Sequence, residues 1–201
     1  MTCERLPFIP DTPNDDLVLL HQFHVCETYG LHRHAFYEVF YVVRGQAMHE
    51  VNGSAQVTGE GALVFIRPDD RHCYRYLAQP DFEFINVNIA PELLAGAFSY
   101  LRLDRAAFDD PPFPPMVRLT GARHAEMRRK FTELADMAPG PARRQAFCAL
   151  LPEVLRGLAD YRMLIYAVIL ILVMLATNNP GVQDFINTKF RKKKKKEGTA
   201  K

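Results

Sequence analysis

The stretch His32-Arg33-His34-Ala35-Phe36-Tyr37-Glu38 contains three side chains that can bind a metal ion or a polar ligand. His32, His34 and Glu38 share one parity, so on a single extended strand they would point to the same side. A second segment, residues 67–72, ends in His72. If a neighbouring strand carries His72, the four residues converge, and inside a small barrel they would line a pocket. The spacing therefore predicts a binding site.

The residues around this cluster have the pattern of short strands. Residues 37–43 are β-branched and aromatic, with apolar groups on both parities, which indicates a strand covered on both faces. Asn52-Gly53 lies between two strand-like segments and is a strong hairpin signal. Strands are also expected at residues 17–24, 46–51, 54–57, 62–66, 73–77 and 81–89. A series of short strands separated by turns indicates a sandwich or barrel.

The same residues resemble the two motifs of the cupin family. The first motif is matched by His32, His34, Glu38 and Gly45. The second motif is matched by Gly61, Pro68 and His72. Arg67 and Asp69 stand where a proline and a glycine are usual, and Tyr76 replaces the final asparagine. The resemblance implies a mainly β fold, a jelly-roll-like barrel of the cupin type (a double-stranded β-helix).

Residues 15–160 more closely resemble the N-terminal ligand-sensing domain of AraC-type transcriptional regulators. The segment at residues 61–72, Gly-Ala-Leu-Val-Phe-Ile-Arg-Pro-Asp-Asp-Arg-His, is typical of that group. The resemblance implies an effector-binding barrel over residues 1–115, which takes a small polar, sugar-like ligand, and it implies a homodimer.

Helical patterns follow the barrel. Pro91 is expected to begin a helix over residues 91–101. Thr120 could cap a second helix, and residues 139–141 (Pro-Gly-Pro) would separate it from a third. Apolar residues recur at helical spacing at Met127, Phe131, Leu134 and Met137, and again at Phe147, Leu150, Leu151, Val154, Leu155 and Leu158. The helical segment at residues 116–160 either dimerises, as the resemblance implies, or simply covers the barrel.

Beyond Asp160 the chain changes character. Residues 163–176 are apolar on every face, which predicts an apolar helix over residues 161–179 and membrane association through it. This segment resembles the last membrane helix of branched-chain amino acid ABC transporter permeases. A basic, disordered tail is expected at residues 180–201. An AraC-type regulator would continue into helix-turn-helix motifs, which we do not expect in this chain. A natural fusion and a frameshift or assembly artefact both remain open as explanations.

Composition restricts the partners of the barrel. The formal net charge is +2, but residues 191–196 are all basic, so the rest of the chain is net negative. The barrel therefore has no excess positive charge with which to bind nucleic acid, and we expect no sequence-specific DNA binding by this chain alone. The four cysteines are scattered and no signal peptide precedes them, which favours the cytoplasm.

Three interpretations of the cluster remain open. His32, His34, Glu38 and His72 could bind a divalent metal such as Zn, Mn, Fe or Ni, and in cupin enzymes this set holds a catalytic metal. In AraC-type sensors the same cradle often holds no metal and hydrogen-bonds a small polar effector. The cluster could also be a polar core in which Glu38 pairs with a histidine. Phe36 and Phe40 share its parity and are expected to line the pocket.

Two functions are consistent with this sequence. The first is an effector-sensing and dimerisation module of an AraC-type regulator, without catalytic residues and lacking the DNA-reading half. The second is a small metal-dependent cupin enzyme of the dioxygenase or isomerase type. The helices after the barrel favour the regulator. The remaining histidines, His21, His24, His49 and His124, are expected to be incidental.

Overall fold

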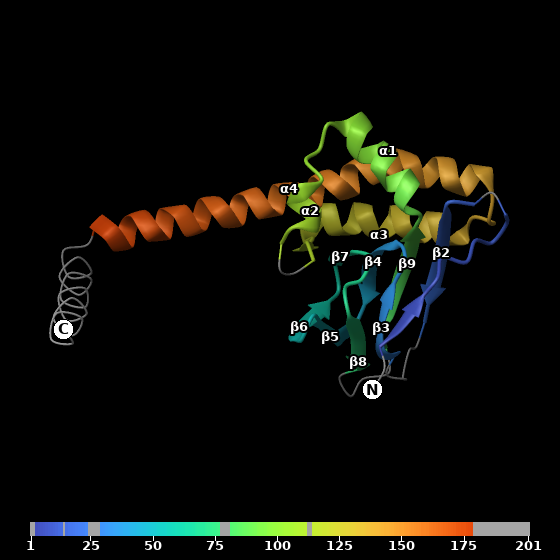
Figure 1. The fold of residues 1–201 in the computed structure, drawn as a ribbon, viewed down its shortest axis with the longest axis horizontal. Coiled ribbons are helices and arrows are strands. Elements are labelled where there is room, and N and C mark those ends of the chain that lie inside the picture. The colour runs from blue at the N-terminus through green and yellow to red at the C-terminus, as the bar shows by residue number, and fades with distance from the viewer. Residues whose placement is uncertain (1–2, 14, 24–28, 77–80, 112–113, 179–201) are drawn as a thin grey trace, which may run out of the picture. The chain divides into compact units, whose positions relative to one another are not determined.

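The computed structural model describes residues 3–13, 15–23, 29–76, 81–111 and 114–178. The chain divides into two compact units, residues 1–159 and residues 160–201. The first unit contains a barrel of two five-stranded sheets (Figure 1). One sheet, called here the histidine sheet, has the strand order β1-β3-β8-β5-β6, and the other, the helix-covered sheet, has the order β10-β7-β4-β9-β2. The mainly β fold expected from the sequence is confirmed.

The strands lie close to the positions that the apolar patterns predict. In the histidine sheet they are β1 (Glu4–Leu6), β3 (Tyr29–His34), β5 (Gln46–Val51), β6 (Ser54–Gly59) and β8 (His72–Tyr76). In the helix-covered sheet they are β2 (Leu17–Gln22), β4 (Tyr37–Arg44), β7 (Ala62–Ile66), β9 (Glu83–Ile89) and β10 (Met116–Arg118). The bounds of β5 and β7 agree with the prediction, whereas the three-residue strands β1 and β10 had no sequence signal.

The predicted hairpin joins β5 to β6. Asn52 and Gly53 form its turn, with φ of 49° and 81°. Two successive positive φ angles define the type I′ turn, whose twist matches that of the flanking strands. The turn fixes the register in which His49 lies directly opposite Gln56.

Strand β4 has two buried faces. Its odd-numbered residues, among them Tyr37 and Tyr41, belong to a core between the sheet and the helices. Its even-numbered residues Phe40 and Val42 belong to a second core inside the barrel. This double burial explains why apolar residues occupy both parities of the strand, as the sequence indicated.

Helices cover the outer face of the helix-covered sheet. They are α1 (Pro91–Leu101), α2 (Ala106–Asp109), α3 (Gly121–Asp136) and the part of α4 (Pro141–Asn178) that belongs to the first unit, up to residue 159. Helix α3 packs against β2, β4 and β9 (Figure 1). Phe131 of α3 is fully buried and stacks on Tyr41, with ring centroids 5.1 Å apart. The helices therefore cover the barrel, and dimerisation through them stays a prediction.

The C-terminal region differs from the expected separate apolar helix over residues 161–179. Helix α4 has the bounds Pro141–Asn178, so this stretch belongs to a helix that begins before it. Within the described residues, no helix is both long and apolar enough to cross a membrane. The predicted basic tail at residues 180–201 lies outside the described part of the chain.

Candidate ligand-binding site in the barrel

The first motif does not form one strand, as its parity suggested. Strand β3 ends at His34, residues 35–36 bend, and β4 begins at Tyr37 in the facing sheet. His32 and His34 therefore approach the barrel interior from one sheet and Glu38 from the other. His34 Nε2 lies 3.4 Å from Glu38 Oε2 across this interior. The predicted convergence is present, but it arises from a bend between two sheets.

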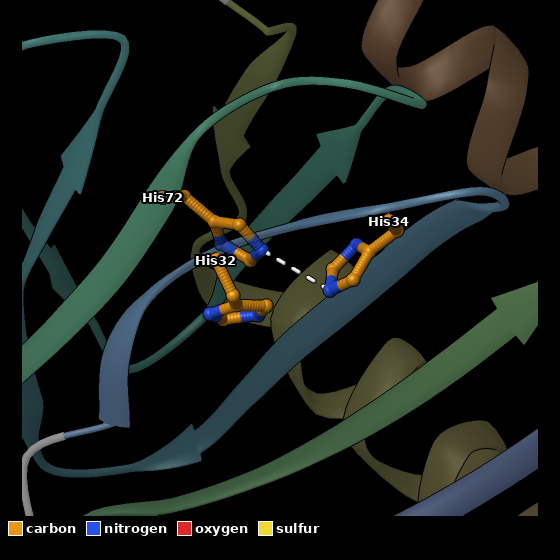
Figure 2. A group of neighbouring side chains, drawn as sticks. All are labelled: His32, His34 and His72. Carbon is orange, nitrogen blue, oxygen red and sulfur yellow. Dashed lines mark hydrogen bonds between the residues drawn. The ribbon is translucent and has the colours of Figure 1, made fainter. Parts of the chain in front are cut away.

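Three imidazoles meet inside the barrel. His72 on β8 lies directly opposite His32 on β3. Figure 2 shows the rings of His32, His34 and His72 turned toward one another, and one nitrogen of each lies within 4.8 Å of the others. His72 Nε2 is 3.3 Å from His34 Nε2. His32 Nδ1 is 2.8 Å from the carbonyl oxygen of Gly30, which can accept a hydrogen bond from it.

Burial keeps these imidazoles neutral. Removal from water disfavours the charged form, which lowers the pKa of His32, lowers that of His72 well below its usual value, and lowers that of His34 to about 3. The neighbouring histidines lower the pKa values of His34 and His72 further. At neutral pH each ring therefore offers one hydrogen-bond donor and one lone pair.

Glu38 is the acidic member of the site. Burial raises its pKa to about 7, against the opposing effect of hydrogen bonds from Asn86 and Tyr74. At neutral pH the carboxyl group of Glu38 is thus partly protonated and partly ionised, while His34 is uncharged. The close approach of His34 to Glu38 is therefore not an ion pair, because His34 carries no charge at neutral pH.

A cavity of about 450 Å³ opens beside the cluster. The predicted site residues His32, His34, Glu38, His72 and Phe36 all line it. Phe36 stacks on His34, with ring centroids 4.5 Å apart and planes 12° from parallel. Phe40, in contrast, is fully buried in the barrel core and is absent from the described residues that line the cavity. It shares the parity of the site but lies deeper than the cavity wall.

Sequence reasoning missed two asparagines and one histidine. Asn86 and Asn88 on β9 line the cavity, opposite Phe40 and Glu38 on β4. The alternation of polar and apolar residues in this strand is the sequence signal that could have found them. His49 on β5 is fully buried, and its Nε2 lies 3.3 Å from His72 Nδ1. It was expected to be incidental because no comparable group of ligand residues lies near it in the sequence.

The family assignment follows from comparison with known sequences. The sequence model described as "AraC-like ligand binding domain" matches residues 20–160. The chain belongs to this family. Its barrel is thus a cupin-type sensing domain, in agreement with the resemblance of the two histidine motifs.

Two individual proteins are also similar to parts of this chain. The HTH-type transcriptional activator RhaS of Klebsiella pneumoniae (strain 342) is 40% identical over 45 residues, which are 22% of this chain and 16% of RhaS. The crystal structure of apo ToxT K231A from Vibrio cholerae strain SCE256 has a TM-score of 0.56 at 9% identity, covering 70% of this chain and 54% of ToxT. The likeness to ToxT shows the fold alone, and this chain spans about half of the length of that protein.

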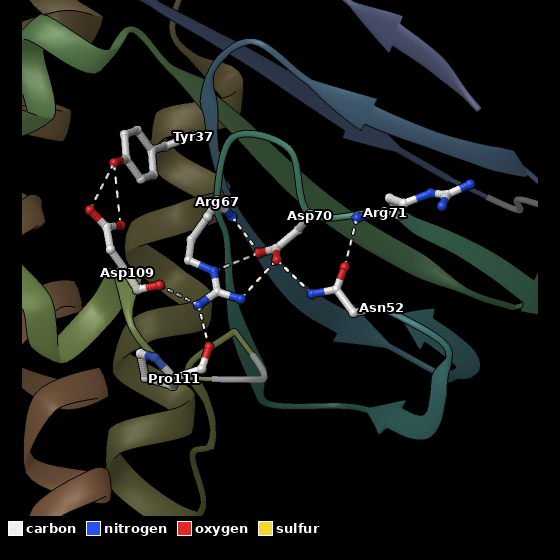
Figure 3. A network of polar contacts seen from close by, with 7 residues as sticks. All are labelled: Tyr37, Asn52, Arg67, Asp70, Arg71, Asp109 and Pro111. Atoms are coloured by element: carbon white, nitrogen blue, oxygen red, sulfur yellow. Dashed lines mark hydrogen bonds and ion pairs between the residues drawn. The ribbon is translucent and has the colours of Figure 1, made fainter. Parts of the chain in front are cut away.

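In this AraC-like ligand binding domain, an ionic network holds the turn that precedes His72 (Figure 3). Arg67 donates to both carboxylate oxygens of Asp70 and also to the carbonyl oxygens of Asp109 and Pro111. Asn52 donates to Asp70 at 2.7 Å. Burial raises the pKa of Asp70, but these hydrogen bonds outweigh it and keep that pKa below its usual value. The network ties the pocket strand β8 to the segment after α2.

Proposed function

We propose that this chain is the effector-sensing part of an AraC-type transcriptional regulator, and that its cavity binds a small polar, hydroxyl-rich effector. Membership of the ligand-binding family supports the sensing role. The sugar-like character of the effector is argued from the cavity wall. Dimerisation, DNA binding and regulation belong to the whole regulator and are part of this proposal.

The observation that carries the proposal is a pair of unpartnered acceptors. The side-chain oxygens of Asn86 and Asn88 are buried and have no hydrogen-bond partner among the described residues. A buried carbonyl oxygen without a partner costs about 1–3 kcal/mol, so such groups are normally satisfied by a ligand or water. Both asparagines line the cavity, although the two oxygens have almost no accessible surface, so a small rotation of the amides would let the hydroxyl groups of a bound polyol donate to them.

The opposite wall supplies complementary groups. The neutral imidazoles of His32, His34 and His72 can each donate or accept, and Glu38 can do either near neutral pH. Phe36 offers an apolar face beside them. Since the site has hydrogen-bonding groups on both walls and little fixed charge, it favours an uncharged polar molecule over an anion or a cation.

The proposal is tested by measuring effector binding directly. Isothermal titration with a panel of pentoses, hexoses and deoxyhexoses should identify a ligand that binds the wild-type protein. Asn88→Leu should weaken that binding by roughly fivefold, because one net hydrogen bond is worth about 1 kcal/mol. The exposed Gln46→Leu is the matched control and should bind as the wild type does. Failure of every polyol to bind would reject the sugar-like effector.

A metal site is a second candidate, favoured by the histidine cluster. Zinc binds imidazole nitrogen at about 2.0–2.1 Å, so two ligand atoms of one ion lie at most about 4.2 Å apart. The three histidine nitrogens lie within 4.8 Å of one another, so any pair near that limit must close slightly. Neutral imidazoles with a nearby carboxyl group suit Zn, Mn, Fe or Ni. His32, His34 and His72, with Glu38, would hold the ion, which would act as a Lewis acid in the alternative role as a cupin enzyme.

Elemental analysis and metal titration test this candidate. Protein purified without chelators should contain a stoichiometric divalent metal if the site is occupied in the cell. His32→Gln and His72→Gln should each lower its occupancy, whereas the exposed Gln46→Leu should not. A wild-type protein that neither carries a metal nor binds added Zn²⁺ would reject the metal site.

A further inference from the structure

A chain of hydrogen bonds crosses the histidine sheet from its edge strand to the cavity. Gln56 on β6 places its amide nitrogen 3.5 Å from His49 Nδ1. His49 Nε2 lies 3.3 Å from His72 Nδ1, and His72 Nε2 lies 3.3 Å from His34 Nε2. His49 and His72 are fully buried, and Gln56 is half-buried at the outer end. Four side chains on four different strands thus form one continuous path.

The hydrogen bonds along this path have a common direction from donor to acceptor. A neutral imidazole has one donor nitrogen and one acceptor nitrogen, so every bond along the path must run in the same sense. Burial lowers the pKa of His49 to about 4, which keeps this ring neutral as well. The Gln56 amide nitrogen can only donate. His49 then accepts at Nδ1 and donates from Nε2 to His72 Nδ1, and His72 must carry its hydrogen on Nε2.

The direction of these hydrogen bonds decides whether His72 Nε2, at the cavity wall, is a donor or an acceptor. With hydrogen on Nε2, His72 donates toward His34 Nε2 at the cavity wall, where a bound ligand could share this donor, and it cannot ligate a metal there. If the Gln56 amide rotates so that its oxygen faces His49, every bond reverses, and His72 Nε2 has a lone pair that accepts from His34 Nε2. The His49 ring cannot easily flip to compensate. It stacks on Tyr74, with centroids 4.8 Å apart, and meets Phe40 edge-on.

We propose that Gln56 is a positioning residue whose amide orientation sets the tautomer of His72. In one orientation His72 Nε2 carries a hydrogen that His34 and a bound organic effector can share, and in the other it carries a lone pair that a metal ion can take in place of the hydrogen bond from His34. The meaning of the two states for ligands rests on the proposed function of the cavity. The tautomer itself does not, because it follows from hydrogen bonds within the histidine sheet.

The deciding experiment fixes the direction of the hydrogen bonds along this path, once in each sense. Gln56→Glu replaces the amide by a carboxylate, which can only accept, and so imposes the reversed sense. Gln56→Lys replaces it by an ammonium group, which can only donate, and so keeps the original sense. Gln46→Glu is the control for charge, since this exposed residue lies on the neighbouring strand β5. Spectra are recorded at pH 8.5, well above the ordinary histidine pKa of about 6.5, so that each ring is neutral.

The readout is the histidine tautomer in long-range ¹H–¹⁵N spectra of the full chain, with His72 assigned from its loss in His72→Gln. The hydrogen of His72 should lie on Nε2 in the wild type, in Gln56→Lys and in Gln46→Glu, and on Nδ1 in Gln56→Glu. An unchanged tautomer in Gln56→Glu overturns the proposal, and so does the same change in Gln46→Glu. Should Gln56→Glu fail to fold, a hydrogen on Nδ1 in Gln56→Lys would overturn it.

Titration with Zn²⁺ separates this inference from the function of the cavity. Gln56→Glu should bind Zn²⁺ at least about tenfold more tightly than the wild type, the scale on which groups behind metal ligands act. A tautomer that switches without Zn²⁺ binding in any variant upholds the role of Gln56 and rejects the metal candidate. If all variants bind Zn²⁺ equally and the tautomer is unchanged, the metal candidate is upheld and the role of Gln56 is rejected.

Discussion

The guanidinium of Arg67 donates two hydrogen bonds to the carboxylate of Asp70, Nε to Oδ2 at 2.8 Å and Nη2 to Oδ1 at 2.8 Å. Both side chains are buried, with 10% and 6% of their surfaces exposed. A bidentate pair in this setting is far less screened by water than a surface pair. It secures the turn between β7 and β8, at a position where cupin motifs usually have a proline.

Replacing Arg67 should destabilise the domain strongly. Arg67→Leu leaves the Asp70 carboxylate buried without its partner, which typically costs about 3–5 kcal/mol in the free energy of unfolding. Urea denaturation measures this loss. Arg75→Leu is the control, because Arg75 pairs with Glu50 while 65% of its side chain is exposed, and such surface pairs contribute at most about 1 kcal/mol. Equal losses in the two variants would contradict the assigned role of Arg67.

Stability should fall as the pH drops below about 6.5. The unfolded chain takes up protons on its histidines near that pH, whereas the folded protein resists protonation of His34 down to about pH 3 and of His49 down to about pH 4. The unfolded state then binds more protons, so the free energy of unfolding decreases on acidification. His32 and His72, whose pKa values are also lowered, act in the same direction.

Glu38 acts in the opposite sense and provides the control. Its pKa is raised to about 7, so the folded protein takes up a proton that the unfolded chain binds only near pH 4.3. This uptake stabilises the fold as the pH falls from 7 toward 4. Urea midpoints at pH 7.5, 6.0 and 5.0 should therefore drop in the wild type and drop more steeply in Glu38→Gln. A midpoint that rises on acidification would show that the histidines are not held neutral.

Ending the chain after Ala159 should leave a folded domain. Residues 1–159 form one compact unit, which keeps the buried stripe of α4 up to Leu158. The removed part includes Leu170 to Leu175, six apolar residues that each expose more than half of their surface. We expect an unchanged melting temperature and less self-association by analytical ultracentrifugation.

A shorter chain supplies the comparison. Ending it at Met137 also removes Phe147, Leu151 and Leu155, which are buried in the core beneath the helices. This variant should unfold or aggregate. If the chain ending at Ala159 behaves in the same way, the apolar residues beyond it contribute to the core of the domain.

DNA binding by this chain should be weak and indifferent to sequence. The basic residues 191–196 can attract phosphates, but the rest of the chain is net negative. In mobility-shift titrations, the logarithm of the affinity should fall with that of the salt concentration, with a slope no steeper than about −5 for six phosphate contacts. Changing Lys192–Lys196 to glutamine should abolish the shift. A preference for one operator over scrambled DNA at physiological salt would refute this prediction.

Local patterns made the fold predictable. The Asn52-Gly53 turn, the strand periods and the start of α1 at Pro91 depend on residues adjacent in the sequence, and the structure has all three. The glycine of the first motif is explained by its surroundings. Gly45 has φ of 77°, and a Cβ there would lie 2.5 Å from the carbonyl oxygen of Asp81. Asp69, which replaces a usual glycine, still adopts φ of 69°.

The candidate site was only partly predictable, because sheet pairing decides it. Nothing in residues 32–38 shows that the chain changes sheets between His34 and Glu38. His49 joins the cluster through the pairing of β5 with β8, which lie far apart in the sequence. The inward orientation of Asn86 and Asn88 required knowledge of which face of β9 meets the barrel interior. These relationships are non-local, so apolar periodicity carried no information about them.

The two-faced sheet divides the protein into parts that can be engineered separately. The even-numbered residues 38 on β4 and 84, 86 and 88 on β9 line the cavity, while the odd-numbered residues of the same strands pack under the helices. A mutant library restricted to the even positions would search new effector specificities without altering the surface on which α3 rests. A biosensor could thus be given a new ligand while keeping the helical layer that would carry its output.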